Sequence, residues 1–123
     1  MFYISYGEFE SIVHDSISIF AKTKPEINRN IAFLIEETPN QQQRKKLQLL
    51  PNQTLFGLYE GLPLSRRLGQ TKTLPDKITI FKNPIEQSVN SLEELKEQVK
   101  HTLWHEIAHY YGLNHEDINK KEG

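Results

Sequence analysis

The sequence predicts an α+β fold in one domain that covers residues 1–123. Two stretches near the ends of the chain have the apolar spacing of amphipathic helices, and short apolar runs between them are typical of strands. A chain of 123 residues is long enough to bury a core within one domain. We therefore expect an N-terminal helix, a short mixed sheet of three to four strands, and a C-terminal helix that carries the functional residues.

The N-terminal helix is predicted to span about Tyr6–Ala21. Ser5 and Glu8 have the S-x-x-E spacing of a capping box, which satisfies backbone N–H groups at a helix start. Pro25 follows the stretch and is incompatible with a continuing helix. His14 lies beside the apolar stripe, where a lone histidine is usually structural or exposed. The stripe itself consists of Phe9, Ile12, Val13, Ile17 and Phe20.

Three segments rich in β-branched and aromatic residues are predicted to be strands, namely Ile31–Glu36, Leu55–Gly61 and Lys77–Lys82. The connector over residues 38–54 has room for one helical turn. Its three consecutive basic residues, Arg44-Lys45-Lys46, are expected to be solvated rather than bound to nucleic acid. Gly57, inside the second strand, has two interpretations. It is either a weak point in an edge strand or a place where an extended peptide pairs by strand addition.

The loop over residues 62–75 contains Arg66 and Arg67. These arginines are either solvated or bind the carboxylate of a substrate. After the third strand, Asn83-Pro84 is expected to end the extended conformation.

A second capping box, formed by Ser91 and Glu94, predicts the start of a long C-terminal helix. His101, His105 and His109 follow a different line along this helix from its apolar residues, so it packs with one side and can bind with another. The core stripe is predicted to contain Leu92, Leu95, Val99, Leu103, Ile107 and Tyr110.

The end of this helix has the pattern H-E-x-x-H-x-x-G-x-x-H. His105 and His109 are one helical turn apart and can offer two imidazoles to one metal ion, while Glu106 can act as general base on a water that the metal makes acidic. Gly112 can end the helix in a left-handed conformation, so that the chain turns and His115 becomes a third ligand. Three protein ligands and one open position are typical of a catalytic zinc site.

Other polar side chains near this motif have less specific interpretations. His101 is too far along the helix to bind the same ion as both ligands, and it either lines the cleft or is partly exposed. Tyr110 and Tyr111 are expected to be core or wall residues, with donation to an oxyanion as the alternative. Glu116 and Asp117 either orient an imidazole or begin a final helical turn.

The composition excludes several classes of function. The chain has no cysteine, so disulfides and thiolate ligands are excluded, and its net charge of −1 does not favour nucleic acid or an anionic membrane. The N-terminus lacks the pattern of a signal peptide, and we find no apolar segment of membrane-spanning length. We expect a soluble cytoplasmic protein that acts on a peptide or unfolded protein, binds neither nucleic acid nor membrane, and is by default a monomer.

These motifs resemble the small bacterial zincin-like metallopeptidases, a family long described as a domain of unknown function. The resemblance extends from about Phe9 onward. It depends on the zinc motif and on two earlier segments. The matching residues are Leu55 to Pro63 with Arg67, Leu74 to Ile78 with Ile80-Phe81, and His105 to Gly112.

The resemblance implies a minimal zincin fold with bound Zn²⁺. By analogy with larger zincins, Leu55–Tyr59 is the edge strand that aligns a peptide, with Phe56, Gly57 and Leu58 as substrate-binding residues. Many members carry Asp at the third-ligand position, whereas this chain has His115. That spelling is closer to the metzincins, but their methionine turn downstream of the motif has no counterpart here.

The expected function is therefore hydrolysis of peptide bonds by a zinc metallopeptidase with Glu106 as its general base. The alternative is a zinc-stabilised module that binds a peptide or protein with little or no turnover. Cleavage that a chelator abolishes would distinguish the first from the second.

Overall fold

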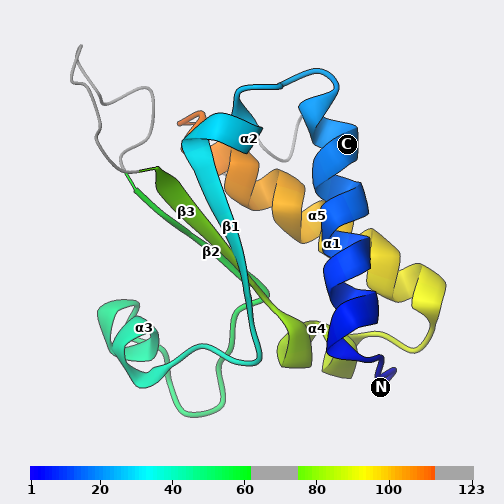
Figure 1. Cartoon of the computed structure of the whole chain (residues 1–123). Helices are drawn as coiled ribbons and strands as arrows, with labels where there is room; N and C mark the ends of the chain where they lie inside the picture. Colours follow the sequence, from blue (N-terminus) through cyan, green and yellow to red (C-terminus); the bar gives the residue numbers. More distant parts are fainter. Residues whose placement is uncertain (62–74, 113–123) are drawn as a thin grey trace.

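The computed structural model describes residues 1–61 and 75–112 of the chain. These residues form helices and a small sheet, which confirms the α+β class (Figure 1). In chain order the elements are α1 (Tyr6–Ala21), α2 (Ile27–Asn30), β1 (Ile31–Glu36), α3 (Gln41–Lys46), β2 (Gly57–Glu60), β3 (Asp76–Phe81), α4 (Lys82–Ser88) and α5 (Leu92–Tyr110).

The sheet is mixed and has the strand order β1-β3-β2. The central strand β3 pairs with β1 in parallel and with β2 in antiparallel orientation. Among the described strands, β2 is therefore at an edge of the sheet, as the resemblance implied for the segment around Gly57. Its register places Gly57 opposite Ile80 and Tyr59 opposite Ile78.

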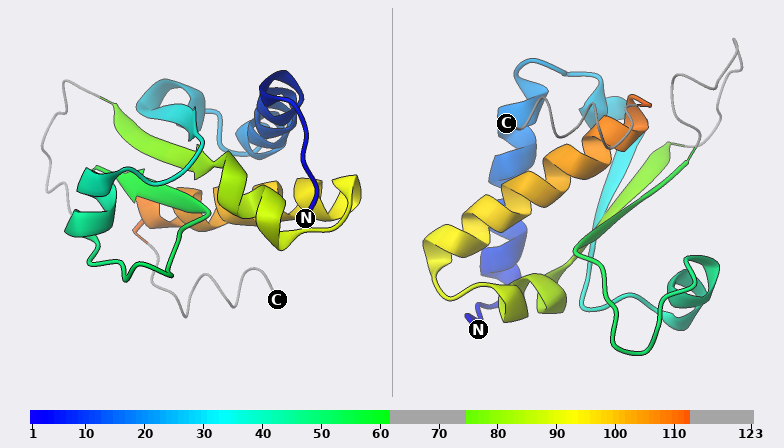
Figure 2. Two further views of the ribbon diagram at one scale, coloured as in Figure 1. Left: turned by 90° about the horizontal axis from the view of Figure 1, so that it is seen from below. Right: turned by 180° about the vertical axis from the view of Figure 1, so that it is seen from behind.

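Helix α5 covers one face of this sheet and crosses α1, as two opposite views show (Figures 1 and 2). It contacts β2, β3, α1 and α4, so the core lies between α5 and the sheet. Most of the predicted stripe of α5 is fully buried there, whereas Leu92, its first residue, is 40% exposed and does not belong to the core. The fully buried hydrophobic residues include Phe9, Ile27, Ile78, Ile80, Leu95, Val99, Leu103, Ile107 and Tyr110.

Local capping explains where the two long helices begin. The hydroxyl of Ser5 accepts a hydrogen bond from the N–H of Glu8, and that of Ser91 accepts one from the N–H of Glu94, each at 3.1 Å. Both helices therefore start at the predicted capping residues.

The sequence analysis did not predict the short helices α2 and α4. The third strand ends before Asn83-Pro84, as expected, but the chain enters α4 directly after β3. Pro84 is the third residue of this helix, where its missing N–H has no helical acceptor, so proline is tolerated there. The second strand is also shorter than predicted, since β2 begins at Gly57.

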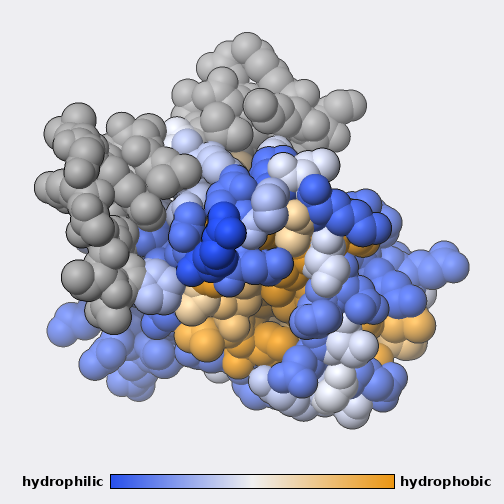
Figure 3. All heavy atoms as spheres, turned by 45° about the horizontal axis from the view of Figure 1, so that its top comes forward, coloured by the Kyte–Doolittle hydropathy of each residue, from blue (hydrophilic) through white to orange (hydrophobic). Residues whose placement is uncertain are grey.

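Figure 3 shows hydrophilic side chains over most of this face, with hydrophobic side chains in its lower centre and toward its right edge. No helix among the described residues is long and apolar enough to cross a membrane.

Candidate metal centre

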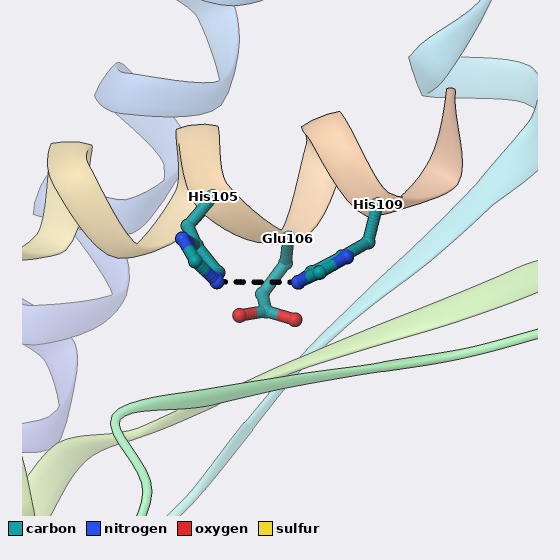
Figure 4. Close-up of side chains that lie close together, drawn as sticks. All are labelled: His105, Glu106 and His109. Carbon is teal, nitrogen blue, oxygen red and sulfur yellow. Dashed lines mark hydrogen bonds between the residues drawn. The ribbon is translucent and has the colours of Figure 1, made fainter. Parts of the chain in front are cut away.

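His105 and His109 converge near the end of α5. Residues four apart on a helix lie on the same face, one turn above each other. Their Nε2 atoms are 3.2 Å apart and their ring centroids 4.8 Å apart. Figure 4 shows both imidazoles on the side of α5 that faces the strands, with Glu106 between them.

The donor set fits a zinc ion. Two nitrogens that each lie about 2.0–2.1 Å from one Zn²⁺ at a tetrahedral angle are separated by about 3.3 Å, close to the separation of the two Nε2 atoms. Possible ligand atoms of His105, Glu106 and His109 all lie within 4.8 Å of one another. The resting rotamers of the two histidines therefore already suit shared coordination.

Glu106 is almost completely buried, with 8% of its surface exposed. Burial raises the pKa of its carboxyl group to about 7, because the charged form loses hydration. The backbone N–H of Tyr59 donates a hydrogen bond to this group and lowers the pKa in part. A carboxyl that titrates near neutral pH can both accept and return a proton under physiological conditions.

Strand β2 lies directly against this part of α5, because Gly57 has no side chain. A Cβ atom at this position would be 2.7 Å from Cγ2 of Thr102 and 3.2 Å from Cγ of Glu106. Such distances are shorter than van der Waals contact, so only glycine allows the strand and helix to approach this closely. Gly57, which lies in the predicted second strand, is therefore the point where β2 approaches α5 closely, beside Glu106.

The backbone of β2 offers hydrogen-bonding groups at its outer edge. The N–H of Phe81 donates to the carbonyl oxygen of Phe56 at 2.9 Å. In an antiparallel ladder, alternate residues turn their backbone groups toward the neighbouring strand, so those of Phe56 and Leu58 face β3. Those of Gly57 and Tyr59 face away from β3, and the N–H of Tyr59 meets Glu106 there.

Helix α5 ends as the motif predicts. Gly112 has a φ of 84°, in the left-handed region that glycine adopts most readily, and its N–H donates to the carbonyl oxygen of His109 at 2.9 Å. His115, the predicted third ligand, lies outside the described residues, as do Arg66, Arg67 and the residues that follow His115.

The remaining candidates do not join the site. His14 and His101 are exposed on α1 and α5. Tyr110 is fully buried and accepts a hydrogen bond from Asn30, while the hydroxyl of Tyr111 donates to Glu26. Both tyrosines thus have the core or wall role that we favoured over donation to an oxyanion.

Sequence reasoning missed the part that Tyr59 plays beside Glu106. The residue was recognised only as the end of an edge strand. The alternation of Gly57, Tyr59 and Gly61 on one face of that strand was the available signal. Its meaning depends on which face meets α5, and strand and helix are far apart in sequence.

A family model described as zincin-like metallopeptidase matches residues 28–123 of the chain. No match was found among curated proteins. The match includes β2, β3 and the whole of α5. Helix α5 carries the two imidazoles and Glu106, and β2 is the strand that lies against Glu106. The chain therefore belongs to the zincin-like metallopeptidase family.

Proposed function

We propose that this protein is a zinc-dependent metallopeptidase that hydrolyses peptide bonds with Glu106 as general base. The main support is the position of Glu106. Its buried carboxylate lies between His105 and His109 and accepts a hydrogen bond from an edge strand. A merely structural histidine pair does not require a carboxylate of raised pKa beside it.

His105 and His109 would hold the ion, with His115 as the third ligand. When bound, Zn²⁺ makes a coordinated water more acidic and polarises the scissile carbonyl. Glu106 removes the proton of the attacking water and later donates it to the amine that leaves. Before the ion binds, burial holds the pKa of this carboxyl group at about 7, well above its ordinary value.

The substrate would bind as an extended strand beside β2. Gly57 presents its backbone groups at the outer edge of the sheet, and a Cβ atom at this position would be 3.2 Å from Cγ of Glu106. The edge is therefore next to the proposed general base. Pairing there would place the peptide along α5. Hydrogen bonds to the peptide backbone would provide most of the binding, so the enzyme would have little preference for the peptide's sequence. Of the predicted substrate-binding residues, Phe56 and Leu58 would then contribute through their side chains rather than their backbone groups.

The test separates metal binding from catalysis. We expect Glu106→Ala to retain zinc and lose cleavage of a fluorogenic peptide library, because the variant keeps the ligands and loses the base. His109→Ala should lose both, and a chelator should abolish cleavage by the wild type. Zinc affinity is measured by competition with a chromophoric chelator.

Two results would contradict the assignment. Equal loss of zinc in both variants would mean that Glu106 is not a base but a ligand. Stoichiometric capture of peptides by the zinc-loaded wild type, without products, would favour the alternative binding module, which can use the same edge of β2.

A further inference from the structure

The face of β2 that meets α5 has an unusual composition. Gly57 and Tyr59 are two residues apart in β2, so both positions belong to one face, and Gly61 follows directly after the strand. Gly57 leaves room for Thr102 of α5, whereas a Cβ atom at Gly61 would be 2.7 Å from Oδ1 of Asp76. Both glycines are needed for close approach, and Tyr59 is the one large side chain between them.

Tyr59 makes hydrogen bonds through both ends of the residue. Its N–H donates to the carboxyl group of Glu106, and its hydroxyl donates to Oδ2 of Asp76 at 2.5 Å. Between these contacts, its ring packs edge to face against Tyr110, with the ring centroids 6.3 Å apart and the planes at 76°. The residue therefore connects β2 to β3 and to α5 at once.

The contact between Tyr59 and Asp76 lies in the interior of the protein. Asp76, the first residue of β3, is 1% exposed, and a buried carboxylate is costly unless it is hydrogen-bonded. The strand partner of Tyr59 is Ile78, so Asp76 lies diagonally across the ladder on the same face. The hydroxyl thus connects β2 to β3 by a bond that does not belong to the backbone ladder.

We propose that Tyr59, held in place by Asp76, is a positioning residue for Glu106. The inference rests on the function proposed above. β2 has only four residues and, among the described strands, pairs with β3 alone, so its ladder restrains it weakly. The bond to Asp76 restrains the strand further and thereby sets the place where the N–H of Tyr59 meets the Glu106 carboxylate. Small displacements of a catalytic group have large effects on rate.

The first experiment compares two tyrosine variants. Tyr59→Phe keeps the ring against Tyr110 and removes the hydroxyl, and we expect kcat to fall about 10-fold. Zinc affinity should stay within about 2-fold, because the bond to Asp76 does not involve the histidines of α5. The matched control is Tyr111→Phe, which also removes a hydroxyl bonded to a carboxylate, that of Glu26, and should retain kcat. Equal kcat in Tyr59→Phe and wild type, or equal losses in both variants, would overturn the proposal.

A double-mutant cycle tests the partner. In an Asp76→Ala background, the further change Tyr59→Phe should cost less than about 2-fold in kcat, because the bond is already absent. A full further loss would show that the hydroxyl acts through another group.

Amide hydrogen exchange in the metal-free protein gives a measurement that needs no turnover. We expect the amide of residue 59 to exchange at least about 10-fold faster in Tyr59→Phe, with exchange in the middle of α5 unchanged. An unchanged amide would overturn the inference even in an active enzyme. An inactive wild type that shows faster exchange in the variant would instead contradict the peptidase function and leave the contact itself established.

Discussion

At the scale of single residues, burial determines the protonation of Glu106. Its ordinary pKa of 4.5 rises to about 7 because the folded chain excludes water from the carboxyl group. The folded protein therefore binds this proton more tightly than the unfolded chain does. Stability that depends on the proton is present below the ordinary pKa and is lost as the pH rises through the folded one.

The metal-free protein should accordingly become less stable between about pH 4.5 and pH 7. Removal of the proton from Glu106 should cost about 2 to 4 kcal/mol of unfolding free energy over this range. Urea unfolding at pH 5 and at pH 8 measures the loss. Glu106→Gln, a neutral side chain of similar shape, should show a smaller difference between the two pH values. An identical pH dependence in both proteins would mean that the carboxyl group titrates normally.

At the scale of secondary-structure elements, the contact between β2 and α5 depends on Gly57. Gly57→Ala would bring a Cβ atom against Thr102, Glu106 and the carbonyl oxygen of Thr79, at 2.7, 3.2 and 3.3 Å. We expect the strand to move away from the helix, with a loss of about 1 to 3 kcal/mol in stability and at least about 10-fold in kcat.

Gly7→Ala provides the control for that change. A Cβ atom at Gly7, in α1, would meet nothing within 4 Å. Alanine favours the helix, so this variant should gain up to about 1 kcal/mol and keep its activity. Unfolding curves and initial rates of the two variants decide the comparison. Equal behaviour of both alanine variants would show that the space at Gly57 is not needed.

The elements that local chemistry defines could be predicted from the sequence. Helix α1 and strand β1 have the predicted bounds, because a capping serine and flanking turn residues mark their ends. Helix α4 could not be predicted in this way. Its proline, Pro84, comes three positions after the last residue of β3, and whether such a proline ends a segment or occupies the first turn of a helix depends on tertiary packing.

The same distinction applies to the candidate site, where contacts within one helix could be predicted and contacts between elements could not. The ligand pair and Glu106 lie within one helical turn, so their spacing alone predicts that they meet. Tyr59 reaches Glu106 from another element, and its hydroxyl finds Asp76 only through the strand register. Side-chain contacts of this kind depend on the assembled fold and have no local signature.

At the scale of the whole molecule, backbone hydrogen bonds to Glu86, which forms a buried ion pair with Lys82 within α4, attach the N-terminal segment to this helix. Glu86 is 2% exposed and accepts hydrogen bonds from Lys82 Nζ at 3.0 Å and from the N–H of Ile4 at 2.8 Å. The carbonyl oxygen of Glu86 accepts a further bond from the N–H of Phe2. The first residues of the chain thus lie beside α4 (Figure 1).

We expect Lys82→Met to destabilise the protein by about 3 to 5 kcal/mol, because Glu86 would remain buried without its cation. The double variant Lys82→Met with Glu86→Leu should recover a large part of this loss, since it leaves no unpaired charge. Denaturant unfolding of both proteins gives the comparison. A double variant as unstable as the single one would show that packing, rather than charge, is responsible.

The two imidazoles of the candidate centre lie only four positions apart along the polypeptide, on a single turn of α5. A denatured chain keeps these neighbours together and so retains part of its attraction for zinc. By mass action, an ion that also associates with the denatured ensemble protects the native state less than its affinity suggests. Saturating zinc should therefore raise the melting temperature only modestly, and the fold should be able to form before the ion arrives.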